Sequence, residues 1–153
     1  MTLTSLITQS KIFFLDTAPL IYFIEAHPVY GEAVRQLILS CAKKKIQIVS
    51  SVITLHEVLV RPYRNGNALL AQKFSVFLKN NRSLMLLSIS EDISEMAAKL
   101  RGDYVWLKLA DALQIAAALD AGADLFLTND KQLKQIREIQ IVILDDWREQ
   151  ALE

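Results

Sequence analysis

The chain has 153 residues, of which 52% are hydrophobic, and no Pro/Gly/Ser-rich linker divides it, so we expect one domain spanning residues 1–153. Its 17 Lys and Arg residues balance its 17 Asp and Glu residues, so net charge gives no indication of nucleic-acid binding. Cys41 is the only cysteine, which excludes an intramolecular disulfide and fits a reducing compartment. No apolar run approaches the ~18 residues that span a bilayer, and we expect a cytoplasmic protein without membrane contact.

Five short apolar segments predict strands that are buried on both faces. These segments are residues 12–15, 46–49, 84–89, 125–127 and 141–144. Between them, apolar residues recur at helical spacing in residues 34–41, 70–78, 93–100 and 109–116. Strands that alternate with helices predict an α/β fold with three layers, in which helices cover both faces of a central parallel sheet of about five strands.

Residues typical of helix ends and loops separate these segments. Thr17 with Pro19, the pair Ser50-Ser51, and Ser90 are each suited to begin a helix directly after a strand. Gly122 is placed to close the alanine-rich helix. The stretch 62–67, which contains a proline and a glycine, predicts a loop between two helices.

Four acidic residues occupy comparable positions relative to the predicted strands. Asp16 follows the first strand and Asp130 the fourth, while Glu57 lies about two turns into the helix after the second strand. Asp111 stands near the start of the alanine-rich helix 110–119. In an open parallel sheet the ligand crevice lies outside the carboxyl ends of the strands. We therefore expect the four carboxylates to meet at one rim.

Such a cluster requires a cation, because like-charged carboxylates repel one another and burial increases the repulsion. Oxygen ligands without an accompanying Cys/His set favour a hard ion, Mg²⁺ or Mn²⁺. The chemistry that this indicates is metal-assisted phosphoryl transfer.

Each acid also has a simpler explanation. Asp16 and Asp130 could cap the helices that follow them, and Asp111 could complement a helix dipole. Glu57 is harder to explain in this way, because it lies within the apolar stretch 52–60, where an unpaired carboxylate is costly.

Three segments of the sequence resemble the PIN-domain ribonucleases, especially the VapC-like toxins of type II toxin–antitoxin systems. They are FFLDTAPLIYFIE (13–25), SSVITLHEVLVRP (50–62) and LKLADALQIAAALDAGADLFLTND (107–130). The similarity covers residues 12–144. Its last segment is the most specific, since it combines an acid at the start of an alanine-rich helix, a small-residue turn, a strand and Thr-Asn-Asp.

The resemblance implies a role for each of the matching residues. Asp16, Glu57, Asp111 and Asp130 are then the four metal-binding, catalytic acids, in that order, and Thr128 supplies a hydroxyl that orients Asp16 or a metal-bound water. The implied activity is Mg²⁺- or Mn²⁺-dependent endonucleolytic cleavage of RNA, leaving 5′-phosphate and 3′-hydroxyl ends. The implied partners are RNA as substrate, a second copy of the chain in a homodimer, and a cognate antitoxin whose basic residue enters the acidic site.

Basic residues close to these acids in the sequence are candidates for holding RNA phosphates. They are Arg61, Arg64, Lys108, Lys131 and Lys134. The run of lysines at 43–45 precedes a strand instead, so we expect it at the opposite rim, at the end of a helix. Tyr104 and Trp106 either stack on a base or a neighbouring chain, or pack in the core.

Two further segments are open to interpretation. Helices 17–25 and 67–79 carry more large apolar residues than one buried stripe needs, and part of this surface is expected to face a partner. Residues 1–10 precede the start of the resemblance and are expected to be either disordered or an extension outside the fold.

Other functional classes fit less well. His56-Glu57 resembles half of the zinc motif H-E-x-x-H, but Val60 occupies the position of the second histidine. No Walker A or G-x-G-x-x-G motif is present. A phosphatase that uses Asp16 would want a second acid at position 18, which is alanine. A non-catalytic PIN-like module that binds RNA or protein remains the alternative.

Overall fold

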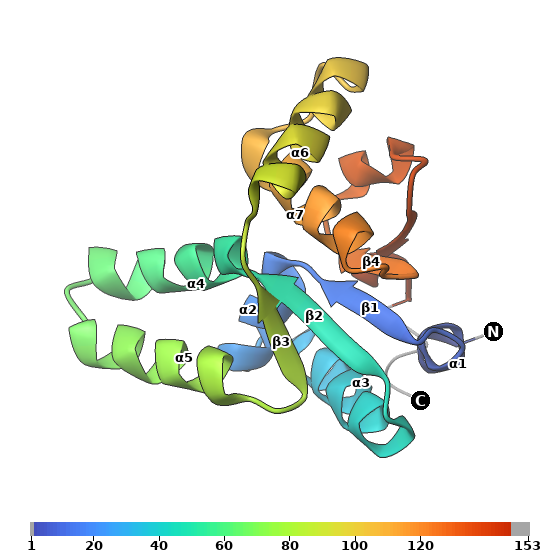
Figure 1. Ribbon diagram of the computed structural model, residues 1–153. Coiled ribbons are helices and arrows are strands. Elements are labelled where there is room, and N and C mark those ends of the chain that lie inside the picture. Colours follow the sequence, from blue (N-terminus) through green and yellow to red (C-terminus); the bar gives the residue numbers. More distant parts are fainter. Residues whose placement is uncertain (1, 148–153) are drawn as a thin grey trace.

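The structure is a computed structural model, which describes residues 2–147; Met1 and residues 148–153 lie outside the described part. One sheet of five parallel strands has the order β3-β2-β1-β4-β5 (Figure 1). The strands are β1 (Ile12–Leu15), β2 (Gln47–Ser51), β3 (Leu84–Leu87), β4 (Leu125–Thr128) and β5 (Gln140–Ile143). The α-helices are α1 (Leu3–Thr8), α2 (Thr17–Ile24), α3 (Gly31–Lys44), α4 (Val52–Arg64), α5 (Ala68–Asn80), α6 (Glu91–Asp103) and α7 (Leu109–Asp120). Two short 3₁₀ helices follow, η1 (Lys131–Gln135) and η2 (Leu144–Trp147).

Alternating side chains of β1 supply both layers of the core. Phe13 and Leu15 join the cluster formed with α1, α2 and α3, whereas Phe14 joins the cluster formed with α6 and α7. Phe14 stacks on Phe126 of the neighbouring strand β4, with ring centroids 5.0 Å apart. The predicted three-layer α/β architecture with a five-stranded parallel sheet is confirmed.

One edge strand differs from the prediction that every strand is buried on both faces. Met85 of β3 is 51% exposed, whereas residues 141–144, predicted as the last strand, are half-buried or buried. Each edge strand pairs with one neighbour only, so solvent reaches part of its surface. Among the described residues, no helix is both long and apolar enough to cross a membrane.

The predicted helix boundaries are largely confirmed. The hydroxyl of Ser51 accepts a hydrogen bond from the Ile53 amide at the start of α4, and Ser90 caps α6 in the same manner. Gly122, with a φ of 73°, lies just past the end of α7 in the left-handed region that glycine adopts without strain. The three lysines lie at the end of α3, which precedes β2 and therefore stands at the opposite edge from the strands' carboxyl ends.

Two predictions about local structure are wrong. Helix α4 continues through Pro62 to Arg64, so the loop is shorter than predicted; packing of α4 against α5 outweighs the one backbone hydrogen bond that a proline removes. The N-terminal segment is not an extension outside the fold. It forms α1, whose Leu3 and Ile7 are buried in the core cluster beside α3.

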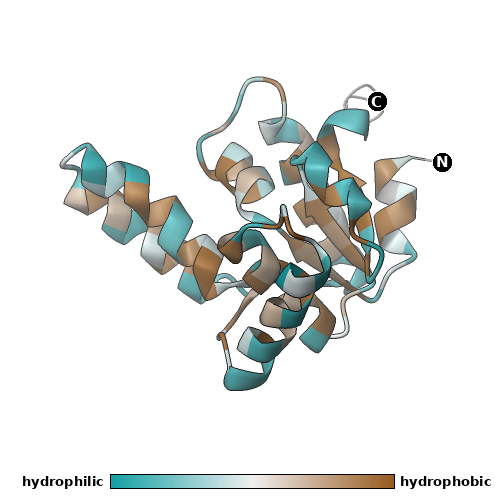
Figure 2. Ribbon diagram, turned by 90° about the horizontal axis from the view of Figure 1, so that it is seen from above, coloured by the Kyte–Doolittle hydropathy of each residue, from teal (hydrophilic) through white to brown (hydrophobic). Residues whose placement is uncertain are grey.

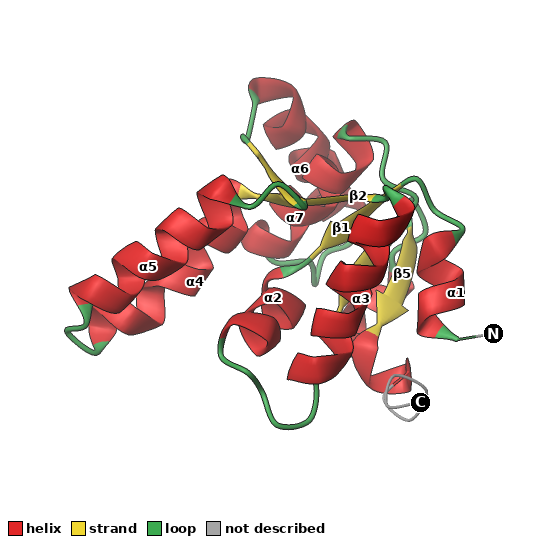
Figure 3. Cartoon of the chain, turned by 90° about the horizontal axis from the view of Figure 1, so that it is seen from below, coloured by secondary structure: helices red, strands yellow, loops and turns green. Residues whose placement is uncertain are grey.

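Helices α4 and α5 lie side by side and extend together away from the sheet (Figures 1 and 3). Their surface mixes polar and apolar residues (Figure 2). Large apolar side chains of α5 remain exposed there, namely Leu69, Val76 and Phe77. The apolar residues Ile21, Tyr22, Phe23 and Ile24 of α2 are half-buried against the core. The predicted excess of apolar surface is therefore found mainly on α5.

Candidate active site

All four acids expected at the sheet rim line one pocket. The strands are parallel, so their carboxyl ends meet at the same edge, and the strand order reverses between β1 and β4. The pocket opens at this reversal. Its lining consists of Asp16, Thr17, Ala18, Ile21, Tyr22, Glu57, Asp111, Thr128, Asn129 and Asp130.

Asp16 is the most buried of the four acids, with 8% of its surface exposed. Its backbone amide donates to the Leu127 carbonyl at 2.9 Å, which fixes the residue against β4. The Oγ1 of Thr128 donates to its Oδ2 at 2.8 Å, as the resemblance implied for a residue that orients Asp16. Asp16 occupies the N-cap position of α2 but makes no side-chain capping bond; a hydrogen bond from the Thr17 backbone lowers the pKa of its carboxylate.

Gln114 is a site residue that the sequence analysis missed. Its Nε2 donates to Oδ1 of Asp16 at 3.2 Å and to Oγ1 of Thr54 at 2.6 Å, and its Oε1 accepts from the hydroxyl of Ser51. Gln114 follows Asp111 by three residues and so lies on the same face of α7. The sequence feature that could have revealed it is the amide itself, because Gln114 is the one polar residue in the apolar stretch 112–119.

Glu57 and Asp111 are half-buried on facing helices, α4 and α7. Burial raises the pKa of Glu57, and the charge of Asp111 raises it further, while a hydrogen bond from Thr17 lowers it. Burial, followed by the charges of Asp16 and Asp130, raises the pKa of Asp111 to about 6. Burial also raises the pKa of Asp16, against the hydrogen bond from Thr128.

Asp130 is exposed and has two roles in the structure. Its Oδ1 accepts from the Gln132 amide at 3.0 Å, which confirms the capping interpretation for η1. Its own amide donates to Oγ1 of Thr128 at 3.2 Å, and its side chain lines the pocket.

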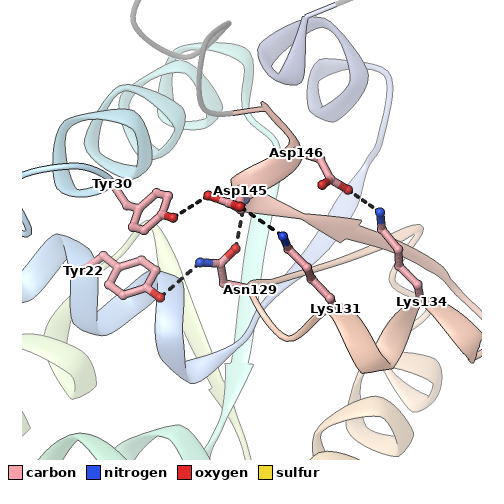
Figure 4. Close-up of polar contacts among 7 residues, drawn as sticks. All are labelled: Tyr22, Tyr30, Asn129, Lys131, Lys134, Asp145 and Asp146. Carbon is pink, nitrogen blue, oxygen red and sulfur yellow. Dashed lines mark hydrogen bonds and ion pairs between the residues drawn. The ribbon is translucent and has the colours of Figure 1, made fainter.

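A second polar network holds the turn between Thr128 and Asp130 (Figure 4). Asn129 donates to the hydroxyl of Tyr22 at 3.2 Å and accepts from the backbone amide of Asp145 at 2.9 Å. The carboxylate of Asp145 accepts from Tyr30 and pairs with Lys131 at 3.3 Å. This turn is therefore tied to α2, α3 and η2.

The five basic residues expected to hold RNA do not line the pocket. Arg61 pairs with Glu25 at 3.5 Å, Lys131 with Asp145, and Lys134 with Asp146. Arg64 and Lys108 are exposed and form no ion pair within residues 2–147. Because exposed ion pairs are weak, a phosphate could replace any of these carboxylates, and RNA contact stays a prediction for all five.

Tyr104 and Trp106 pack against the core, as one of the two predicted alternatives has it. Both are half-buried against the α6–α7 cluster and contact each other, with ring centroids 5.9 Å apart. The hydroxyl of Tyr104 also donates to the Glu138 carboxylate. Val105, between them, is 92% exposed.

The donor set of the pocket suits a hard divalent cation. Its charged groups are carboxylates, and none of the four forms an ion pair with a Lys or Arg of the described part of the chain. No three such acids of residues 2–147 already stand at ligand distances, as expected of carboxylates that repel one another. Asp16, Glu57, Asp111 and Asp130 are the residues that would hold Mg²⁺ or Mn²⁺.

The sequence matches the family model of the PIN domain over residues 13–139, and the chain therefore belongs to the PIN domain family. A comparison with curated proteins gave no significant match.

Solved structures show the same fold at low identity. The Rickettsia felis VapBC2 complex bound to a promoter DNA fragment contains a chain with a TM-score of 0.67 and 21% identity, covering 86% of this chain and 98% of that one. VapC20 of Mycobacterium tuberculosis, described as a sarcin-ricin loop cleaving toxin, gives 0.63 and 17%, covering 84% and 98%. A toxin–antitoxin complex from Klebsiella pneumoniae gives 0.58 and 23%, covering 86% and 96%.

Charge repulsion in this pocket predicts how Asp111→Asn changes stability. The pKa of Asp111 rises from 3.8 to about 6 on folding, so its ionisation destabilises the metal-free protein above that pH and has no effect below both values. Asp111→Asn should therefore raise the free energy of unfolding at pH 8 by about 1 kcal/mol, allowing for solvent screening of a half-buried group, and leave it unchanged at pH 3. Thermal unfolding in EDTA measures this.

Asp120→Asn is the matched control, because Asp120 is an exposed acid at the other end of the same helix. Without metal, Asp111→Asn should be more stable than the wild type at pH 8. Adding Mn²⁺ should make the wild type the more stable of the two, since the ion stabilises it more than Asp111→Asn. A wild type and an Asp111→Asn protein that unfold at the same temperature at pH 8, with and without Mn²⁺, would contradict the electrostatic account.

Proposed function

We propose that the protein is a Mg²⁺- or Mn²⁺-dependent endoribonuclease, the toxin of a toxin–antitoxin pair. The observation that carries the proposal is the meeting of four carboxylates from four separate elements in one pocket, without a basic side chain among its lining residues. Such an arrangement is unfavourable for folding and is explained by cation binding.

A bound divalent ion in this pocket supplies an activated water and neutralises the charge that develops on a phosphodiester. The protein's own groups orient the carboxylates and form the walls of the pocket. Thr128 and Gln114 hold the two oxygens of Asp16, so its remaining lone pairs face the pocket. The half-buried Glu57 and Asp111 close the pocket from two helices, and the exposed Asp130 stands at its open side.

Relatives of the same fold support RNA as the substrate and an antitoxin as the partner. One of them is described as cleaving the sarcin-ricin loop, and others were solved as VapBC or toxin–antitoxin complexes. The acids and the hydroxyl that the resemblance requires are all present in this chain and line one pocket. This favours an active enzyme over a non-catalytic binding module.

Cleavage of mixed single-stranded RNA by the purified protein tests the nuclease. Activity should require Mg²⁺ or Mn²⁺, disappear in EDTA and return when Mn²⁺ is added in excess. Asp16→Asn should lower the rate at least about 100-fold, because it removes the anionic ligand that is held most rigidly. Gel electrophoresis of end-labelled RNA measures the rate and identifies the ends.

Asp120→Asn, an exposed Asp-to-Asn change outside the pocket, should leave the rate unchanged. Cleavage that persists in EDTA or in Asp16→Asn would show a different reaction or a contaminant. RNA binding without cleavage under every metal condition would favour the non-catalytic module instead.

Lys108 is the basic residue that we assign most directly to RNA. It precedes α7, is exposed, and its charge lowers the pKa of Asp111, so it stands within electrostatic range of the pocket. Lys108→Gln should lower kcat/KM for all RNA sequences alike, because a phosphate contact does not depend on the base. It should also reduce the magnitude of the slope of log kcat/KM against log salt concentration by about 0.7. Lys43→Gln, at the opposite edge of the sheet, serves as the control. Equal slopes for wild type and Lys108→Gln would exclude a phosphate contact.

Growth of a bacterial host tests the toxin assignment. Induction of the wild-type gene should arrest growth, whereas Asp16→Asn should not, because the toxicity depends on RNA cleavage. If a small open reading frame lies immediately upstream of the gene, its co-expression should restore growth. Arrest by Asp16→Asn that equals arrest by the wild type would separate any toxicity from the pocket.

A further inference from the structure

Gln114 is unusual for its place in the fold. It is 1% exposed, and the other buried residues of α7 are alanines and Ile115. A buried amide destabilises the fold unless its donors and acceptor all find partners. Gln114 is fully satisfied, and every partner is a polar side chain at or beside the acidic pocket.

The orientation of the Gln114 amide is fixed from both ends. The hydroxyl of Ser51 accepts from the Ile53 amide at 3.1 Å and gives its single proton to Oε1 of Gln114. An ionised Asp16 carboxylate can only accept, so the NH₂ group must face it. A flipped amide would place its oxygen against the carboxylate and leave Asp16 with a repulsive neighbour.

The series of hydrogen bonds continues from Gln114 through Thr54 to Thr17, in the direction of Glu57. Oγ1 of Thr54 accepts from Gln114 at 2.6 Å and from Ser50 at 2.8 Å, which uses both of its lone pairs. The proton of Thr54 is then directed to Oγ1 of Thr17, 3.1 Å away. Oγ1 of Thr17 also accepts from Gln114 at 3.4 Å, so Gln114 and Thr54 hold this hydroxyl together. The presence of Thr17 lowers the pKa of the half-buried Glu57 against the larger effect of burial.

We propose that Gln114 is a positioning residue for the metal centre, which fixes the Asp16 carboxylate in one orientation and ties it to the N-terminus of α4, the helix that carries Glu57. This inference rests on the proposed function, since it assigns the purpose of the amide to metal binding. Thr128 supplies the donor to one oxygen of Asp16 and Gln114 the donor to the other. Together they leave the carboxylate no freedom to turn away from the pocket.

Gln114→Met removes the hydrogen bonds and keeps an unbranched side chain of similar length. The affinity for Mn²⁺, measured by calorimetric titration, should fall about 10- to 100-fold, as for other partners of metal-ligating residues. In RNA cleavage, kcat should fall with it, whereas KM for RNA should stay within about twofold at saturating Mn²⁺, because Gln114 is buried and does not reach the substrate. Ile115→Met is the matched control, a fully buried neighbour on α7 that faces the core.

A second pair of variants covers the case in which Gln114→Met does not fold. Ser51→Ala and Ser90→Ala each remove the N-cap of a helix, but only Ser51 also donates to Gln114. Ser51→Ala should weaken Mn²⁺ binding several-fold beyond Ser90→Ala, whereas Ser51→Thr, which keeps the hydroxyl, should restore it. Equal Mn²⁺ affinities for the two alanine variants, or for Gln114→Met and Ile115→Met, would overturn the inference.

Mn²⁺ binding and RNA cleavage by the wild type distinguish an error in the proposed function from an error in this inference. A wild type that binds Mn²⁺ but cleaves no RNA would remove the nuclease proposal, while the Mn²⁺ affinities of the five variants would still decide the role of Gln114. A wild type that binds no Mn²⁺ would overturn both.

Discussion

Pairing of β1 with β4 is the constraint on which the site depends. Leu15 lies opposite Leu127 and Phe14 stacks on Phe126, so the residues that follow, Asp16 and Thr128, emerge side by side where the strand order reverses. The backbone bond from Asp16 to Leu127 extends the ladder to the acid itself. The position of Asp16 is therefore set by the sheet, and the other three acids are arranged around it.

The four acids differ in how deeply they are buried and in how many hydrogen-bond donors their carboxylates receive. Asp16 is almost fully buried and receives two side-chain donors, whereas Glu57 and Asp111 are half-buried and repel each other across the pocket. These hydrogen bonds oppose the effect of burial on Asp16, but they do not cancel the repulsion, because the charge of Asp16 still raises the pKa of Asp111. The metal-free fold carries this repulsion as a loss of stability, and a divalent ion would remove it, which is the usual relation between function and stability at an active site.

Residues close to a strand end could be predicted from the sequence, and residues that act across the fold could not. Asp16 and Asp130 follow from strand position, Thr128 follows from the family resemblance, and the PIN domain match agrees with that resemblance. Gln114 escaped because it is polar and lies off the apolar positions that predicted this helix, and its partners Ser51 and Asp16 lie 63 and 98 positions away in the chain. The exposure of β3 depends on the strand order, and the docking of α1 depends on the position of α3; a local sequence pattern gives neither.

In the turn that carries Asp130, the capping role is compatible with the proposed metal binding. A carboxylate has about four acceptor sites, and the cap of η1 uses one of them on Oδ1, so Oδ2 is available to the pocket. The cap also fixes the side chain, while Asn129 ties the preceding residue to Tyr22 of α2 and to the backbone of Asp145 in η2. An exposed acid on a 3₁₀ turn is in this way held by several elements at once. Asp130 is therefore placed less deeply than Asp16, but by the same means, through hydrogen bonds that fix the carboxylate before any ion arrives.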